Sequence, residues 1–391
     1  MSSVIDWKKV RKECKKLGIF DGHYNPSNNR FEEAYWQVCL SMRGSEKTTG
    51  FVLLGMVIHR MYGSIVEYFR TMPDDCRPKE HSHFFDSIIS YEIKGRNYIE
   101  ILTDDKYNSV EYKAGFWYYR RCNENGEVVV VDPKPFMHVY PVRKAMDLKS
   151  NYTSNSSFII YDEFIDPTKI YKDDFVLLCD CISTIFRQRY GWVCLLANTL
   201  DRQSIWFREL CISREVSSMV LGETKLIKNE EQTPVLVNIL PANITEAKKR
   251  HNLSLFSFKN SKLSAITGTS EGWAMKVYPR LPRAKNEYLC RNIYLDVDGF
   301  TVRVDFLIND IVGFCIQIVD TDVTDPLENK DDAIVITTGM IERERTHYLF
   351  SLKPFMKVLS ECMNKNKVFF SSNESGVTFD HFVNHSHYWN G

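Results

Sequence analysis

The chain has 391 residues, of which 44% are hydrophobic and 13% aromatic, enough for two domains with packed cores. Its 50 basic and 50 acidic residues cancel, so any contact with nucleic acid depends on local patches rather than on overall charge. No apolar run approaches the roughly 18 residues that a membrane helix needs, and the first residues form no apolar signal segment, so we expect no membrane partner and a reducing cytosol.

The first element expected is an amphipathic helix over residues 4–17. Trp7, Val10 and Cys14 share one face, lysines and arginines cover the rest, and Gly18 marks the end. The basic face is either solvated or a contact for the phosphates of a nucleic acid. Charge runs are more often solvated, which favours the first interpretation.

Between residues 24 and 198, apolar strands alternate with helical stretches, as in a parallel sheet flanked by helices. The expected strands are 34–41, 64–69, 98–102, 127–131, 158–161 and 192–197, and the expected helices are 48–61, 81–90 and 173–188. Residues 202–255 lose this alternation and predict a linker subdomain. From about residue 256, strands closed by turns predict a separate α+β domain, with a hairpin at Asp298-Gly299.

A phosphate-binding loop is predicted where the strand over 34–41 breaks into a small-residue turn. Such a loop needs backbone N–H groups and a helix N-terminus around the anion, a lysine for the β- and γ-phosphates, and a hydroxyl for Mg²⁺. Lys47 and Thr48 supply the last two. Ser41 and Glu46 stand where the pattern G-x-x-x-x-G-K-[ST] has glycines, so an ordinary strand–turn–helix is the simpler interpretation of the loop alone.

A second segment changes that balance. Four apolar residues, 158–161, lead directly into Asp162 and Glu163. Ligands of α/β sheets bind at the carboxyl ends of the strands, where one acid can hold Mg²⁺ and its neighbour can orient a nucleophilic water. We therefore expect Asp162 to hold the metal and Glu163 to act on the water, and the two segments together predict a protein that hydrolyses ATP.

Two later features fit the same chemistry less specifically. Arg187 and Arg189 end a predicted helix, from which an arginine can reach the site of a neighbouring subunit, although a solvated helix end is the simpler interpretation. Asn198 ends an apolar strand, where it can sense a γ-phosphate or serve only as a turn residue.

Residues 23 to about 385 resemble the DNA-packaging ATPases of phi-29-like short-tailed phages, with the matching segments in the same order along the chain. The resemblance rests on Tyr24-Asn25-Pro26, Arg43-Gly44 with Lys47-Thr48, Lys94-Gly95-Arg96, Tyr161-Asp162-Glu163-Phe164-Ile165, Ile185-Phe186-Arg187-Gln188-Arg189, Leu196-Ala197-Asn198 and Asp298-Gly299-Phe300-Thr301. It implies a terminase-like P-loop ATPase of the FtsK/HerA kind with Walker A and Walker B motifs. Such proteins form a ring, typically of five subunits, that drives double-stranded DNA into a prohead.

The resemblance also implies the cofactors and the site. ATP and Mg²⁺ would be bound, Glu163 would be catalytic, and Arg187 would be an arginine finger acting in trans, with Arg189 as second choice. The nucleotide would contact Arg43, Gly44, Ser45, Glu46, Lys47, Thr48 and Asn198, and Thr48 and Asp162 would hold the metal. Partners would be the portal or connector and a packaging RNA, in the host cytoplasm at the prohead. For contact with DNA we single out four basic residues on predicted loops, Lys94, Arg96, Lys149 and Lys169.

Four parts are therefore expected. They are a basic helical extension (1–22), an α/β P-loop ATPase domain with a mainly parallel sheet (23–201), the linker subdomain (202–255) and an α+β RNase H-like docking domain (256–391).

Two other functions stay open. One is a catalytically weakened nucleotide-binding scaffold at the portal. The other is an active nuclease in the C-terminal domain, for which the candidate acids are Asp296, Asp298, Asp305 and Asp320.

Overall fold

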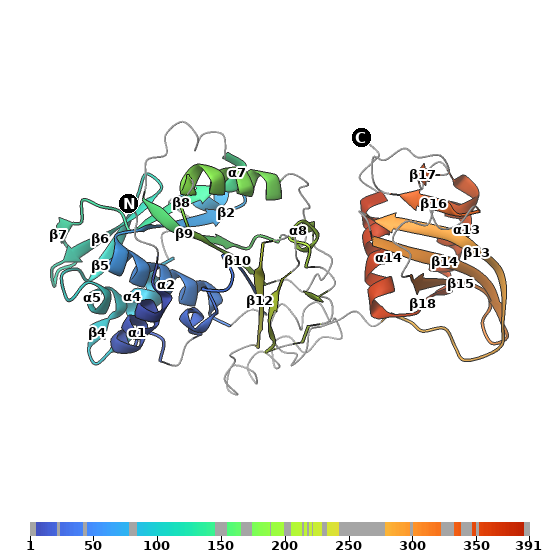
Figure 1. Cartoon of the computed structure of the whole chain (residues 1–391), viewed down its shortest axis with the longest axis horizontal. Helices are drawn as coiled ribbons and strands as arrows, with labels where there is room; N and C mark the ends of the chain where they lie inside the picture. Colours follow the sequence, from blue (N-terminus) through green and yellow to red (C-terminus); the bar gives the residue numbers. More distant parts are fainter. Residues whose placement is uncertain are drawn as a thin grey trace. The chain divides into compact units, whose positions relative to one another are not determined.

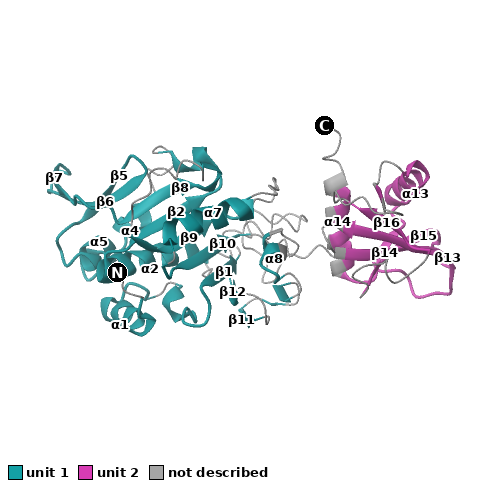
Figure 2. Cartoon of the chain, turned by 45° about the horizontal axis from the view of Figure 1, so that its top comes forward, with its two compact units in different colours: residues 1–274 teal, residues 275–391 magenta. Residues whose placement is uncertain are grey.

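A computed structural model of the chain describes residues 5–21, 24–41, 45–77, 84–144, 155–165, 174–187, 189–198, 205–212, 215–216, 219–220, 222–228, 233–241, 278–297, 300–321, 332–337, 346–348 and 352–386. The chain divides into two units, residues 1–274 and 275–391, which Figure 2 shows in different colours.

The described part of the first unit is built on a ten-stranded sheet (Figure 1). Its strands are β1 (Trp36–Ser41), β2 (Ile65–Arg70), β5 (Ser109–Lys113), β6 (Phe116–Cys122), β7 (Val128–Val131), β8 (Met137–Pro141), β9 (Ser156–Asp162), β10 (Trp192–Ala197), β11 (Thr224–Ile227) and β12 (Val235–Leu240). Their order is β11-β12-β1-β10-β9-β2-β8-β6-β5, with β7 paired to β6. The six strands from β12 to β8 run parallel, so their carboxyl ends share one edge of the sheet.

Helices cover both faces of this sheet. One face carries α1 (Trp7–Leu17), α2 (Lys47–Tyr62), α4 (Asp86–Ser90) and α5 (Tyr98–Leu102), and the other carries α7 (Asp174–Phe186) and α8 (Ile205–Glu209). On β9, Phe158 and Ile160 join the core on the α2 face, whereas Ile159 and Tyr161 join the core on the α7 face. Both kinds of position are apolar because a parallel sheet is buried on both sides.

Most of the strands and helices expected in this unit are present, and two segments differ. Residues 98–102 are not a strand but the helix α5, because the side chains of Asn97 and Glu100 form a reciprocal capping box at its start. Of the expected helix over 81–90, α4 begins at Asp86, and residues 81–83 lie outside the described residues.

The segment expected to be a linker subdomain, 202–255, contributes strands to the same sheet. Val235–Leu240 is a buried apolar run, and β12 pairs in parallel along the whole of β1. β11 then adds the antiparallel edge. The pairing joins residues about 200 positions apart in the sequence, which local alternation does not reveal.

The N-terminal helix α1 is held firmly to the sheet. Asp6 caps it by accepting hydrogen bonds from the backbone N–H groups of residues 8 and 9, both at 3.1 Å. Gly18 ends it in the left-handed conformation at φ 68°, as expected. Trp7 stacks on Phe31 with ring centroids 3.9 Å apart and meets Trp192 edge-on at 5.1 Å. Since Trp192 begins β10, α1 lies near the amino edge of the parallel strands.

The second unit has a six-stranded sheet of its own among the described residues. Its strands are β13 (Asn286–Val297), β14 (Phe300–Asn309), β15 (Gly313–Asp320), β16 (Ile334–Thr337), β17 (Thr346–Tyr348) and β18 (Val368–Phe370), in the order β17-β16-β13-β14-β15-β18. The expected hairpin is confirmed as the antiparallel pair β13–β14, and α13 (Lys353–Asn364) and α14 (Asn373–Ser386) pack on one face. The unit is therefore α+β.

Candidate active site

Two segments 114 residues apart in the sequence meet at the carboxyl edge of the first sheet. The Thr48 hydroxyl donates a hydrogen bond of 3.0 Å to Oδ2 of Asp162. α2 begins directly after the turn that follows β1, which places Thr48 in its first turn. Alternation along β9 puts the side chain of Asp162 on the same face as Ile160, which is the face that α2 covers. The structure thus brings the lysine–threonine turn and the paired acids together.

Lys47 lies in the same place, only 4% exposed. Its Nζ donates a hydrogen bond to the amide oxygen of Asn198, which follows the end of β10. β10 lies between β1 and β9 in the sheet, so three neighbouring strand ends supply these side chains. A buried ammonium in the first turn of a sixteen-residue helix creates a positive potential suited to an anion.

The turn between β1 and α2 is partly described. The Ser45 hydroxyl donates to the Ser41 hydroxyl at 2.6 Å, which closes the turn. Glu46 precedes α2 with φ 58°, in the left-handed region that favours glycine, and its side chain makes no capping hydrogen bond. Arg43 and Gly44 lie outside the described residues.

Glu163 is paired with an arginine that the sequence analysis did not single out. Nη2 of Arg70 donates to Oε2 of Glu163 at 2.6 Å, and Nη1 of Arg70 is 3.9 Å from Oδ2 of Asp162. Glu163 itself has φ 54°, an uncommon conformation for a residue with a side chain. Arg70 ends β2, the neighbour of β9. A charged residue directly after the strand expected over 64–69 was the feature of the sequence that could have pointed to Arg70.

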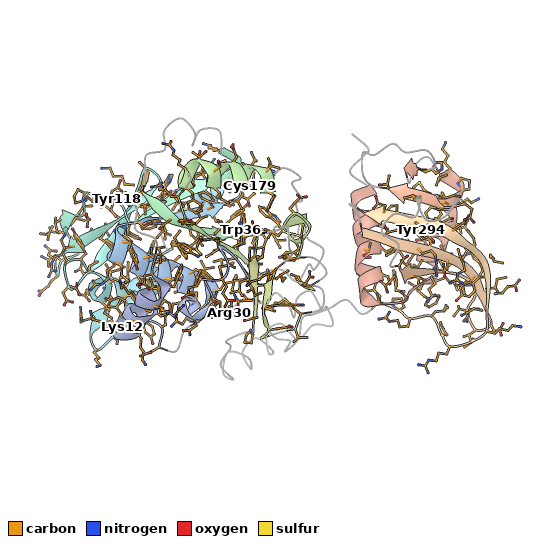
Figure 3. The ribbon with its side chains drawn as sticks, in the orientation of Figure 1. Lys12, Arg30, Trp36, Tyr118, Cys179 and Tyr294 are labelled. Atoms are coloured by element: carbon orange, nitrogen blue, oxygen red, sulfur yellow. The ribbon has the colours of Figure 1, made fainter. Side chains whose placement is uncertain are left out.

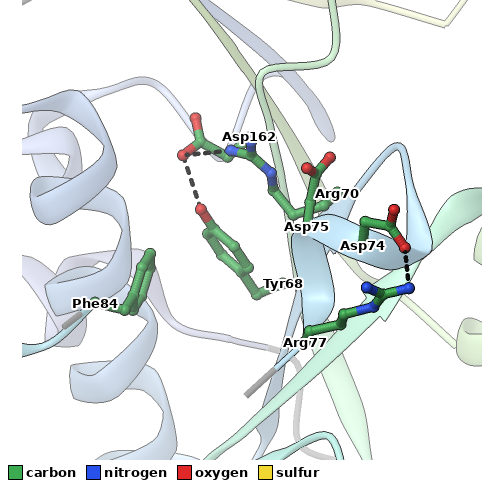
Figure 4. Close-up of a pocket in the computed structure, with 7 residues that line it drawn as sticks. All are labelled: Tyr68, Arg70, Asp74, Asp75, Arg77, Phe84 and Asp162. Atoms are coloured by element: carbon green, nitrogen blue, oxygen red, sulfur yellow. Dashed lines mark hydrogen bonds and ion pairs between the residues drawn. The ribbon is translucent and has the colours of Figure 1, made fainter. Parts of the chain in front are cut away.

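Tyr68 is the other residue that the sequence did not reveal. Its hydroxyl donates to Oδ2 of Asp162 at 2.8 Å (Figure 4). This oxygen therefore accepts hydrogen bonds from both Tyr68 and Thr48. Burial raises the pKa of Tyr68 well above its usual value, and the charge of Asp162 raises it further. The phenol therefore stays protonated and fixes the orientation of the carboxylate.

A pocket of about 440 Å³ opens beside these groups. Figure 4 shows the residues that line it, among them Tyr68 and Arg70 of β2, Asp162 of β9, and Asp74, Asp75 and Arg77 from the turn after β2. Phe84 completes the lining. The pocket gives a polar ligand access to the side chains of Arg70 and Asp162.

The site fits a divalent cation of the magnesium type. The Thr48 hydroxyl and the Asp162 carboxylate are oxygen donors within hydrogen-bond distance of each other. The described residues contain no group of three or more histidine, cysteine, aspartate or glutamate side chains that could hold a metal. Magnesium is commonly held by one or two protein oxygens, with the substrate's phosphates and water completing its shell.

Arg187 and Arg189 are not brought to this site. They follow the end of α7, which leads to the amino end of β10, so they lie at the opposite edge of the parallel strands. Arg189 caps the carboxyl end of α7 by donating to the carbonyls of Ile185 and Phe186. It also donates to the side chain of Asn155. Arg187 is exposed, with φ 42°.

The four basic residues singled out for DNA contact divide in two. Lys94 is exposed at the tip of the hairpin formed by β3 (Glu92–Ile93) and β4 (Arg96–Asn97), with φ 55°. Arg96 is paired with Asp105, its Nε lying 2.7 Å from Oδ1. Lys149 and Lys169 lie outside the described residues.

The candidate nuclease acids of the second unit do not converge. Asp305 is 1% exposed and is neutralised by Arg303, at 2.6 and 3.0 Å, and by Arg291, at 3.4 Å. Such pairing makes it a structural carboxylate rather than a metal ligand.

Asp296 and Asp320 project from opposite faces of that sheet. Leu295 points into the core under α13 and α14, so its neighbour Asp296 lies on the other face of the sheet. Asp320 is the cross-strand partner of Val302, which belongs to that core, so Asp320 lies on the core face. Asp298 lies outside the described residues. The described acids therefore do not share the small volume that a two-metal site requires.

Comparison with known proteins agrees with this architecture. No protein-family model matches the chain, and no curated protein matches it in sequence. The solved structure described as the bacteriophage Phi-29 viral genome packaging motor assembly matches 93% of this chain and 99% of its own, with 15% identity and a TM-score of 0.59. The chain has the fold of that phage motor protein. The resemblance deduced from the sequence is thereby confirmed at the level of the fold.

Two further solved structures are similar at lower scores. The Phi-28 gp11 DNA packaging motor matches 93% of this chain and 97% of its own, with 15% identity and a TM-score of 0.49. The large terminase ATPase domain of Thermus phage P74-26 matches 66% of this chain and 97% of its own, with 11% identity and a TM-score of 0.38.

Proposed function

We propose that this protein is an ATPase that drives double-stranded DNA into a viral prohead, with hydrolysis at the subunit interfaces of a homo-oligomeric ring. The observation that carries the proposal is the contact of Thr48 with Asp162, which joins the phosphate-binding turn to the acidic strand end. The fold shared with the phi-29 structure supports it, because that structure is a viral genome packaging motor assembly.

The chemistry follows from the side chains at the carboxyl edge. The first turn of α2 and the ammonium of Lys47 bind the phosphates of ATP in this proposal, and Asn198, which accepts a hydrogen bond from Lys47, is proposed to contact the γ-phosphate. Thr48 and Asp162 hold Mg²⁺, which neutralises charge on the phosphate oxygens when bound. Glu163 accepts a hydrogen bond from the attacking water once its carboxylate is released from Arg70.

The ring supplies what a single chain lacks. Because Arg187 lies at the opposite edge of the strands from Glu163, it can act only on the site of a neighbouring subunit, as an arginine finger in trans. We propose a ring of five subunits that contacts the portal or connector and a packaging RNA, in the host cytoplasm at the prohead.

The second unit is proposed to be an RNase H-like docking domain without nuclease activity. Three antiparallel strands in chain order, β13, β14 and β15, with β16 and β17 added in parallel beside β13, support this assignment. The neutralised Asp305 and the opposite faces of Asp296 and Asp320 argue against the active nuclease.

The test is ATP hydrolysis by the purified chain with and without duplex DNA. We expect DNA to stimulate turnover, Lys47→Ala to abolish it with loss of ATP binding, and Glu163→Gln to abolish it with ATP still bound. Glu124→Gln, which removes an exposed carboxylate from the β6–β7 turn, is the matched control and should leave turnover unchanged. Absence of any turnover in the presence of DNA would favour the scaffold instead, and normal turnover in Glu163→Gln would refute the role of that acid.

A further inference from the structure

One face of α1 carries a row of lysines that the active site does not use. Lys8, Lys12 and Lys15 are all exposed and stand at positions i, i+4 and i+7, so they form a single stripe along the helix. The stripe lies away from Trp7, Val10 and Cys14, the residues that α1 buries. Figure 3 shows Lys12 at the outer surface of the first unit.

These three lysines differ from their basic neighbours on the helix. Arg11 pairs with Glu32, Lys16 lies 3.6 Å from Glu13, and Lys9 lies 3.5 Å from Asp6. Among the described residues, Lys8, Lys12 and Lys15 have no ion pair. Lys8 acts on the carboxylate of Glu32 only through its charge, and Glu32 is already paired with Arg11. Three like charges along one helix face repel each other, and a polyanion relieves the repulsion.

Three acids on and beside the carboxyl half of α1 are already paired with arginines. Arg60 of α2 pairs with Glu13 at 3.3 Å and with Asp104 at 2.9 Å, and Arg96 pairs with Asp105 at 2.7 Å. The hydrogen bond from Arg60 lowers the pKa of Asp104, and the charges of Lys16 and Arg96 lower it further. Lys16 at the carboxyl end of α1 and Arg96 of the β3–β4 hairpin therefore both act on the carboxylate of Asp104. The basic residues around this carboxylate outnumber it, so the local charge is positive.

We propose that the lysine stripe of α1 is a contact for the phosphate backbone of duplex DNA. The choice of DNA as partner rests on the proposed function and on the positive charge that Lys16 of α1 and Arg96 of the β3–β4 hairpin add around Asp104. The stripe is about 10 Å long, from seven residues at about 1.5 Å rise each. At about 3.4 Å of helix rise per phosphate, it spans about three phosphates of one DNA strand.

The position of the stripe separates this contact from nucleotide binding. α1 packs against Trp192 at the amino end of β10, whereas Lys47 and Asp162 lie at the carboxyl edge of the same strands. α1 is also rigidly capped at both ends. DNA held by the stripe therefore contacts a fixed part of the ATPase unit and leaves the phosphate-binding turn accessible.

The test is the salt dependence of duplex DNA binding by the full chain. The triple variant replaces each stripe lysine with glutamine, a good helix former: Lys8→Gln, Lys12→Gln and Lys15→Gln. Losing three phosphate contacts should reduce the slope of log affinity against log salt concentration by about 2.7 and weaken binding in 0.1 M salt on the order of 10²-fold. DNA-free ATP hydrolysis should stay unchanged, since none of these residues belongs to the active site.

Two control variants make the result specific. The triple variant with Lys8→Arg, Lys12→Arg and Lys15→Arg keeps the charge and should retain the slope. Removal of three exposed lysines elsewhere should also retain it, and the second unit offers Lys353→Gln, Lys357→Gln and Lys365→Gln.

Three results would overturn the proposal. The first is an unchanged salt slope in the triple glutamine variant of α1. The second is an equal loss of slope in the control variant with Lys353→Gln, Lys357→Gln and Lys365→Gln. The third is a loss of affinity for an RNA duplex or an acidic protein but not for duplex DNA. The measurement does not depend on ATP hydrolysis. Lys47→Ala protein should show the full slope, so failure of the proposed ATPase activity and failure of the stripe give different results.

Discussion

Arg70 and Glu163 form an ion pair of 2.6 Å at the ends of adjacent parallel strands. The carboxylate that is proposed to orient water is thereby occupied, and only 20% of the arginine side chain is exposed. Its second nitrogen faces Asp162 across 3.9 Å, so one cation serves both acids of the site. The proposed hydrolysis requires this pair to open, which would make Arg70 a positioning residue for Glu163.

Replacing Arg70 should raise the rate of hydrolysis in the absence of DNA. Arg70→Gln removes the charge that holds Glu163, and a partly exposed pair of this kind contributes about 1 kcal/mol, or roughly fivefold. We expect the DNA-free rate to rise by that factor and the ratio of DNA-stimulated to DNA-free rates to fall. Arg70→Lys, which retains a cation, should stay closer to the native ratio. An equal drop of both rates in Arg70→Gln would show that the arginine acts in catalysis itself.

Replacing Glu46 should raise the affinity of the protein for ATP. Its φ of 58° costs about 1 kcal/mol in a residue with a side chain, and it lies in the turn that is proposed to bind phosphate. Glu46→Gly removes both the strain and the charge, whereas Glu46→Ala removes only the charge. We expect a higher ATP affinity, roughly fivefold, in both variants and a higher free energy of unfolding only in the glycine variant. ATP titration and urea unfolding measure the two effects, and weaker ATP binding by the alanine variant would contradict the electrostatic part.

Local patterns in the sequence predict much of this site, because they report where strands end. Apolar runs that stop at polar residues gave the ends of β1, β9 and β10, and parallel order then brings Thr48, Asp162 and Asn198 to one edge. The spacing of Asn97 and Glu100 is itself a capping signal for a helix, whereas the apolar, isoleucine-rich composition of 98–102 favours a strand.

The remaining features depend on the order of the strands, which local patterns do not contain. Arg70 meets Glu163 only because β2 lies beside β9, and β12 enters the sheet only because it pairs with β1. The αL conformation of Glu46 likewise follows from the way the turn joins α2, since glutamate by itself favours other conformations.

The stability of the first unit should depend on pH through His59. Burial lowers the pKa of His59, although its Nδ1 lies 3.0 Å from the carbonyl oxygen of Ser64. The unfolded chain therefore binds a proton below about pH 6.5 more readily than the folded chain does. The contribution of His59 to stability is complete above that pH and is lost as the pH falls through the lower pKa of the folded state.

His59→Asn tests this pH dependence. Asparagine offers an amide N–H near the position of Nδ1 and does not titrate. We expect the urea midpoint of the variant to fall less between pH 7 and pH 5 than that of the native chain. Parallel curves for the two proteins would assign the acid sensitivity to other groups.

Arg187 and Arg189 should give opposite phenotypes. Arg189 donates to two carbonyls at the end of α7 and to Asn155, so Arg189→Ala should lower the free energy of unfolding by about 1–2 kcal/mol while leaving turnover per folded subunit intact. Arg187 is exposed at the amino edge of the sheet, and its Nε donates to the carbonyl of Thr184 at 3.2 Å. Arg187→Ala should therefore lower the free energy of unfolding less than Arg189→Ala does, and it should abolish DNA-stimulated turnover. Mixing separates action in trans from action in cis: Arg187→Ala and Glu163→Gln subunits, each inactive alone, should regain part of the activity together. A mixture that stays inactive, while each variant still assembles with native subunits, would remove Arg187 from the shared site.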